Sequence, residues 1–102
     1  MDIGVPAEIK TAEKRIGLTP GATNELTSLG HKVVIQSGAG TGAGYEDSSY
    51  QEAGASIVSS AQEVFDSSEM IVKVKEPQSV ERAMLQPHHI LFTYLHLAAD
   101  KP

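Results

Sequence analysis

The stretch MIVKV (70–74) decides how this chain folds. It is short, apolar and rich in β-branched residues, a pattern that is typical of a buried strand. Four more stretches of this kind are spaced along the chain: IGV (3–5), KVVIQ (32–36), SIV (56–58) and ILFTYL (90–95). Helix signals separate them, so strand and helix alternate, and that order favours a parallel sheet with helices on its faces.

Capping residues indicate where the helices begin. Thr19 and Pro20 predict an N-cap and a first helical residue, and Gly30 predicts the left-handed end of that helix. Three shorter helices are predicted over 47–53, 60–65 and 79–85, with Asp47, Ser60 and Ser79 at their starts. We therefore expect one α/β domain over residues 1–102, with a Rossmann-like, open and mostly parallel sheet in a flavodoxin-like arrangement.

The composition is that of a globular protein and narrows the classes of partner. Of the 102 residues, 40% are hydrophobic and 21% are charged, and the net charge is −5. This negative charge argues against nucleic acid, which needs a basic surface. No apolar run approaches the roughly 20 residues that cross a bilayer, and the N-terminus lacks the pattern of a secretory signal. A cytoplasmic location is therefore the default expectation, and the lack of cysteine adds weak support to it.

Three side chains with useful chemistry come after predicted strands: Arg15, Lys75 and His96. In an open parallel sheet, the residues after the carboxyl ends of the strands converge on one crevice, where ligands bind. A guanidinium can hold a carboxylate by two parallel hydrogen bonds, and an imidazole titrates near neutral pH. We therefore predict a site for a small carboxylic acid that also exchanges a proton, with His96 as the acid or base.

Each of these residues also has an ordinary structural interpretation. Arg15 could be a solvated loop arginine beside Glu13. Lys73 and Lys75 lie on the same side of their strand, and both could reach solvent if that strand forms an edge of the sheet. Charge on a buried strand otherwise needs a partner, and Lys75 would then stand at the mouth of the crevice.

The loop 38–44 fits the dinucleotide fingerprint G-x-G-x-x-G/A, but two features count against a cofactor there. Glu46 and Asp47 open the next helix, and their charges oppose a pyrophosphate. The strand that follows lacks the acidic residue that holds the ribose. We expect the glycines to serve a tight turn with positive φ, and we assign no cofactor binding to this loop.

No metal site is predicted from the histidines, which lack the spacings H-x-x-x-H and H-E-x-x-H. His88 and His89 precede the last strand, at the opposite end from His96, and are expected at the surface.

Four stretches of the chain resemble the alanine dehydrogenase family in sequence, order and spacing. They are IGVPAEIKTAEKRIGLTP (3–20), LGHKVVIQSGAGTGAGYEDSSYQEAGA (29–55), VKVKEP (72–77) and LFTYLHLA (91–98). The proton-translocating transhydrogenase α-chain is similar at the start and in the glycine-rich loop. The runs Lys-Glu-Pro (75–77) and Tyr-Leu-His (94–96) favour the dehydrogenase.

The resemblance implies the N-terminal, substrate-binding domain of an enzyme that oxidises L-alanine to pyruvate and ammonia with NAD. It implies that Arg15 holds the substrate carboxylate, that Lys75 hydrogen-bonds the substrate, and that His96 is the catalytic acid/base. Tyr94 is expected to line the same pocket, with a core tyrosine as the alternative. The resemblance also implies a homo-oligomer, a hexamer in the family.

The resemblance further implies that NAD is bound by a domain outside this chain. Hydride transfer needs the nicotinamide against the substrate, so we expect residues 1–102 alone to be inactive. Two rivals remain open on the residues themselves. One is a module that binds a small carboxylate without chemistry, and the other is a module that associates through an open sheet edge. The N-terminal piece of a transhydrogenase α-chain is a third alternative.

Overall fold

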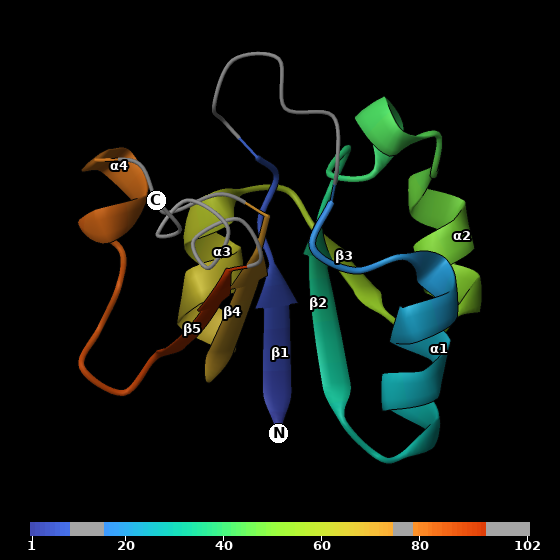
Figure 1. The fold of residues 1–102 in the computed structure, drawn as a ribbon, viewed down its shortest axis with the longest axis horizontal. Helices are drawn as coiled ribbons and strands as arrows, with labels where there is room; N and C mark the ends of the chain where they lie inside the picture. The colour runs from blue at the N-terminus through green and yellow to red at the C-terminus, as the bar shows by residue number, and fades with distance from the viewer. Residues whose placement is uncertain (9–15, 75–78, 94–102) are drawn as a thin grey trace, which may run out of the picture.

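The chain forms a five-stranded parallel sheet with helices packed against both faces (Figure 1). The structure is a computed structural model, and it describes residues 1–8, 16–74 and 79–93. The strands are β1 (Asp2–Val5), β2 (Lys32–Gln36), β3 (Ser56–Val58), β4 (Met70–Lys73) and β5 (Ile90–Thr93), in the spatial order β3-β2-β1-β4-β5. The prediction of a parallel α/β sheet is confirmed. The strand order is that of a Rossmann sheet rather than the flavodoxin order 2-1-3-4-5.

The helices begin close to the predicted positions. They are α1 (Pro20–Ser28), α2 (Asp47–Glu52), α3 (Ala61–Ser67) and α4 (Ser79–Arg82), with a 3-10 turn, η1, at Thr41–Ala43. The hydroxyls of Thr19 and Ser60 cap α1 and α3 as predicted, and Gly30 follows α1 with a φ of 94°. The prediction for α2 is wrong in one detail. Its N-cap is Glu46, because Asp47 turns its carboxylate toward the preceding loop.

The core has two parts, one on each face of the sheet. On one face, α1 packs against β2 and α2 against β3, and Val5, Ile35 and Tyr50 are fully buried there. On the other face, α3 brings Phe65 against Ile71 of β4. Complete burial of a side chain of this size contributes about 1.5–3 kcal/mol. β1 is the central strand of the sheet and β4 lies next to it, so their carboxyl ends are adjacent.

The edge strand β5 is the least covered part of the described sheet. Ile90, Leu91 and Phe92 remain 49%, 40% and 46% exposed. An apolar groove of about 380 Å³ lies beside α1, between Leu26 and Phe92, and its lining is apolar apart from His31. This groove suits hydrocarbon and not a small carboxylate, so it is distinct from the predicted substrate site.

Candidate active site

The direction in which the chain adds strands reverses between β1 and β4, and such a switch point is where open α/β sheets bind ligands. β5 lies parallel to β4 on its other side. Arg15, Lys75 and His96 come after β1, β4 and β5 in the chain, so they follow three neighbouring strands. These three residues and Tyr94 lie outside the described residues, and their roles stay predictions. Among the described residues, charged side chains gather just after β1 and at the end of β4.

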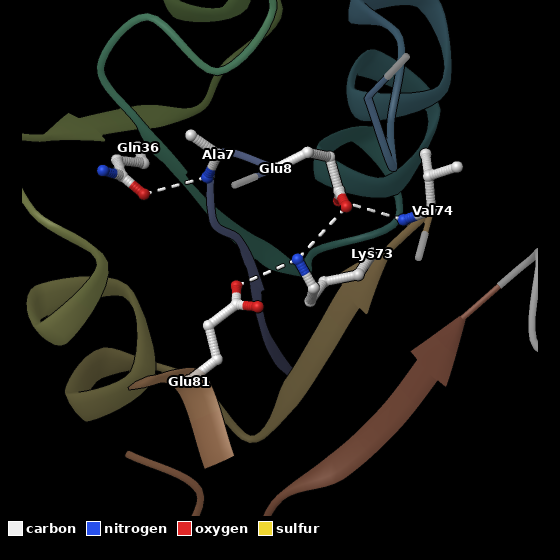
Figure 2. A network of polar contacts seen from close by, with 6 residues as sticks. All are labelled: Ala7, Glu8, Gln36, Lys73, Val74 and Glu81. Atoms are coloured by element: carbon white, nitrogen blue, oxygen red, sulfur yellow. Dashed lines mark hydrogen bonds and ion pairs between the residues drawn. The ribbon is translucent and has the colours of Figure 1, made fainter. Parts of the chain in front are cut away.

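Three charged side chains are buried together at the carboxyl end of β4, and we call them the ion cluster: Lys73, Glu8 and Glu81 (Figure 2). Nζ of Lys73 lies 3.2 Å from Oε1 of Glu8 and 2.9 Å from Oε2 of Glu81. The three side chains are 1%, 3% and 2% exposed, respectively. The alternative in which Lys73 reaches solvent from an edge strand is therefore wrong, because β4 lies between β1 and β5.

Glu8 and its neighbour Ala7 also contact the ends of the two adjoining strands (Figure 2). While its Oε1 accepts from Lys73, its Oε2 accepts the backbone N–H of Val74 at 3.0 Å. One residue earlier, the N–H of Ala7 donates to Oε1 of Gln36, at the end of β2, at 2.8 Å. The segment that follows β1 is therefore fixed between β2 and β4.

The segment that leads into α1 is held just as closely. Gly17 approaches the backbone of β4, because a Cβ built on it would lie only 2.8 Å from the carbonyl oxygen of Val72. The carbonyl of Leu18 accepts the hydroxyl of Tyr50 at 2.8 Å. Burial raises the pKa of Tyr50 to about 12, so this hydroxyl stays protonated and donates. Glu8 and Gly17 therefore both lie against the carboxyl end of β4.

The glycine-rich loop between β2 and α2 is closed on itself. Gly38 and Gly44 adopt φ angles of 79° and 92°, as predicted for a tight turn. The N–H of Gly38 donates to Oδ1 of Asp47 at 2.9 Å, and the hydroxyl of Ser37 donates to Oδ2 at 2.7 Å. The Ser37 hydroxyl, followed by the Gly38 N–H, lowers the pKa of Asp47, so its carboxylate is ionised at neutral pH. The chain's own carboxylate thus takes an N–H group that a pyrophosphate would need.

His88 is exposed, as predicted. His89 stabilises the turn before β5 through both of its ring nitrogens. Nδ1 of His89 accepts the N–H of Gln86 at 2.8 Å, and Nε2 lies 2.7 Å from the carbonyl oxygen of Phe65. These partners fit the neutral ring that carries its proton on Nε2. His89 is half-buried, and both of its ring nitrogens have hydrogen-bond partners in the backbone. The prediction that it lies at the surface is therefore wrong.

Among residues 1–8, 16–74 and 79–93, no group of three or more His, Cys, Asp or Glu side chains is arranged to hold a metal. None of the helices in these ranges is long and apolar enough to cross a membrane.

Sequence reasoning marked Lys73 as unusual but missed its two partners, Glu8 and Glu81. A signal for Glu8 was present, since a lysine on a buried strand needs a carboxylate and Glu8 follows another predicted strand. Glu81 offered no such signal. It belongs to a four-residue helix, and the position of that helix over β4 depends on tertiary packing.

The comparisons with known proteins point to one family. The family model "Alanine dehydrogenase/PNT, N-terminal domain" matches residues 4–102. The chain is 49% identical to alanine dehydrogenase of Bacillus subtilis over 100 residues, which is 98% of this chain and 26% of that protein. It is 50% identical to alanine dehydrogenase of Methanococcus maripaludis over 100 residues, which is 98% of this chain and 27% of that protein. The chain therefore spans about a quarter of the length of these relatives.

Solved structures agree with this result. A structure of L-alanine dehydrogenase superposes with a TM-score of 0.90 at 50% identity, over 99% of this chain and 28% of that one. A transhydrogenase from Sinorhizobium meliloti superposes with a TM-score of 0.84 at 25% identity, over 91% of this chain and 26% of that one. The transhydrogenase is thus the more distant relative of the two. The chain belongs to the alanine dehydrogenase/PNT N-terminal domain family.

Proposed function

We propose that this member of the family is the substrate-binding part of an NAD-dependent alanine dehydrogenase. The parent enzyme converts L-alanine, NAD and water into pyruvate, ammonia and NADH. The observation that carries the proposal is the fixed geometry at the switch point of the sheet. Gly17 and Val74 both lie at the carboxyl end of β4. Gly17 comes two residues after Arg15 in the chain, and Val74 comes directly before Lys75.

Covalent geometry supports a common site for two of these residues. Arg15 is two residues from Gly17, and Lys75 is next to Val74. Consecutive Cα atoms are about 3.8 Å apart, so both residues are tethered within a short distance of the same strand end. An arginine and a lysine tethered there can converge on one small anion, which supports a carboxylate substrate.

The proposed roles follow from the chemistry of each side chain. Arg15 holds the substrate carboxylate through two parallel N–H donors, and the ammonium of Lys75 donates a further hydrogen bond to the substrate. His96 accepts and returns a proton at the reacting nitrogen or oxygen, and Tyr94 lines the pocket. Together these residues orient the substrate Cα for the hydride acceptor.

NAD, which accepts the hydride, belongs on this proposal to a part of the parent enzyme outside this chain. The closed glycine-rich loop supports that assignment, because Asp47 already occupies the N–H of Gly38 and brings a negative charge. We expect residues 1–102 alone to hold substrate without turning it over. A cytoplasmic location and a homo-oligomeric, hexameric parent complete the proposal.

A chimeric enzyme tests this function. This chain replaces the matching part of the Bacillus subtilis alanine dehydrogenase, with which it shares 49% identity. We expect the chimera to reduce NAD when L-alanine is supplied. Arg15→Ala should lower kcat/KM for L-alanine by about 100-fold, as expected for a lost charged hydrogen-bonded pair. His96→Ala should lower kcat by about 100-fold or more, the usual contribution of an acid/base.

The matched control is Lys32→Ala, which removes a cation from the opposite, amino end of β2 and should leave the kinetics unchanged. A folded chimera that binds NAD but oxidises no alanine would contradict the proposed function. Wild-type kinetics in the Arg15→Ala chimera would contradict the proposed site.

A second candidate function is association through the sheet edge, and the exposed apolar residues of β5 favour it. Sedimentation of this chain over a range of concentrations would separate the two. Self-association that persists in Arg15→Ala and disappears in Phe92→Lys would support an assembly role. Pyruvate binding by a monomer would favour the substrate domain.

A further inference from the structure

We propose that His89 makes an acid-sensitive contact, which holds the turn before β5 against α3 only while the imidazole ring is neutral. We call its two ring hydrogen bonds, to Gln86 and to Phe65, the His89 contact. His89 takes no part in the proposed substrate site, so this device and the proposed function can fail separately.

The backbone partners of the two ring nitrogens define one protonation state. Nδ1 lies 2.8 Å from the backbone nitrogen of Gln86, whose N–H can only donate, so Nδ1 is an unprotonated acceptor. Nε2 lies 2.7 Å from the carbonyl oxygen of Phe65, which can only accept, so Nε2 carries the proton. A second proton would have to bind Nδ1, where it would face the N–H of Gln86. The His89 contact is therefore complete only for the neutral ring.

The His89 contact links an exposed turn to the core. The N–H of His89 donates to the carbonyl of Gln86 at 3.0 Å, so a backbone and a side-chain hydrogen bond close this turn together. The imidazole packs edge-on against the ring of Phe65, with the centroids 5.8 Å apart. Phe65 is fully buried on α3, in the part of the core that contains Ile71 of β4. Loss of the hydrogen bond to Gln86 should therefore loosen the turn on this side of the sheet.

The strand β5 depends on this turn, because it begins at the next residue, Ile90. In the described sheet β5 is an edge strand that pairs with β4. Three of its apolar side chains remain 40–49% exposed, so burial stabilises β5 less than it stabilises the central strands. Elements with few buried contacts open locally at a low free energy, so the hydrogen bonds of the turn matter more for β5.

Other charged or titratable groups lie on the elements that adjoin this turn. Among the described residues they are His88 in the turn, Glu63 and Asp66 of α3, Glu69 before β4, and Glu81 and Arg82 of α4. Carboxyl groups ordinarily titrate near pH 4 and guanidinium groups above pH 12, whereas histidine titrates near pH 6.5. The ring centroid of His88 lies 4.3 Å from that of His89, so His88 is the neighbour that an experiment near pH 6.5 must separate from it.

Amide hydrogen exchange of this chain, measured by NMR, tests the His89 contact. Protection is the exchange rate expected for an unfolded peptide divided by the measured rate at the same pH, which removes the intrinsic pH dependence. The protection of the Gln86 N–H should fall by about 3- to 10-fold between about pH 7.5 and pH 5.5, the loss of one partly exposed hydrogen bond.

The matched control within the same chain is the N–H of Gly38, which also donates to a side chain, the carboxylate of Asp47. Hydrogen bonds from Ser37 and Gly38 lower the pKa of Asp47 from 3.8, so this acceptor stays ionised between pH 7.5 and pH 5.5. The protection of Gly38 should therefore not change. Equal losses at Gln86 and Gly38 would overturn the inference, because they would show a general loosening of the fold.

Two variants assign the effect to one ring. His89→Gln removes the titrating group, so the protection of Gln86 should be low at both pH values. His88→Gln should keep the wild-type pH dependence. The inference is overturned if wild-type protection of Gln86 is the same at both pH values, if its pH dependence survives in His89→Gln, or if it disappears in His88→Gln.

If His89→Gln does not fold, the ring signals of the wild-type chain decide. The loss of Gln86 protection should follow the titration of the carbon-bound ring protons of His89. A loss that follows the ring of His88 instead would overturn the inference.

Discussion

Two regions leave the carboxyl edge of this sheet, the glycine-rich loop after β2 and the segment after β1, and they are held in different ways. The glycine-rich loop lies largely at the surface, and the local contact from Asp47 to Gly38 closes it. After β1, the side chain of Glu8 is buried, and it contacts β4 through Lys73 and the N–H of Val74 and, through Lys73, Glu81 of α4. The contact in the glycine-rich loop therefore stabilises only that turn. The contacts of Glu8 instead connect β4 and α4 beside the predicted substrate site.

The largest expected effect of a substitution is at the centre of the ion cluster. Lys73→Met should leave the carboxylates of Glu8 and Glu81 in the interior without their shared cation. Removing one partner of a buried ion pair costs about 3–5 kcal/mol, which urea unfolding of this chain would measure. The matching variant in the glycine-rich loop, Asp47→Asn, should cost about 1 kcal/mol, because its hydrogen bonds are partly exposed. Equal losses in the two variants would contradict the comparison.

A smaller effect tests the role of the glycine-rich loop. A Cβ on Gly40 would lie 2.7 Å from the ring of Tyr50 and 2.9 Å from the carbonyl oxygen of Tyr45. Gly40→Ala should therefore destabilise the chain by about 1–3 kcal/mol through overpacking. Gly21→Ala is the control, because the space around this α1 residue is open and helix propensity should stabilise by about 0.5–1 kcal/mol. Thermal unfolding should shift in opposite directions, and a neutral Gly40→Ala would show that the loop does not depend on this packing.

The smallest effect is the pH dependence of the loop. Hydrogen bonds from Ser37 and Gly38 lower the pKa of Asp47 below its ordinary value of 3.8. The stabilisation from this carboxylate is therefore complete above about pH 4 and is lost as the pH falls through the lower, folded-state pKa. Unfolding free energies measured from pH 6 down to pH 2 should fall less steeply for Asp47→Asn than for wild type. Identical slopes would mean that the carboxylate does not hold the loop.

The sequence predicted the sheet well and the ion cluster poorly, for physical reasons. Strands such as IGV and MIVKV can be predicted because their apolar, β-branched residues are neighbours in the sequence. A cap such as Thr19 acts on N–H groups within one helical turn, so it can be predicted in the same way. The pairing of Lys73 with Glu8 and Glu81 joins residues that are 65 and 8 positions apart in the chain, so it emerges only from packing. The prediction that Asp47 caps α2 was wrong for a related reason. Its carboxylate could bond either the helix N-terminus or the preceding loop, and the sequence does not say which contact forms.

The most direct test of the central claim is calorimetric titration of pyruvate into this chain, as wild type and as Arg15→Ala, with NADH titrated separately. We predict heat on pyruvate addition that disappears in Arg15→Ala, together with no heat from NADH. That result would establish a substrate half-site that depends on a separate cofactor domain. Pyruvate binding that survives in Arg15→Ala, or binding of NADH to this chain, would contradict the account.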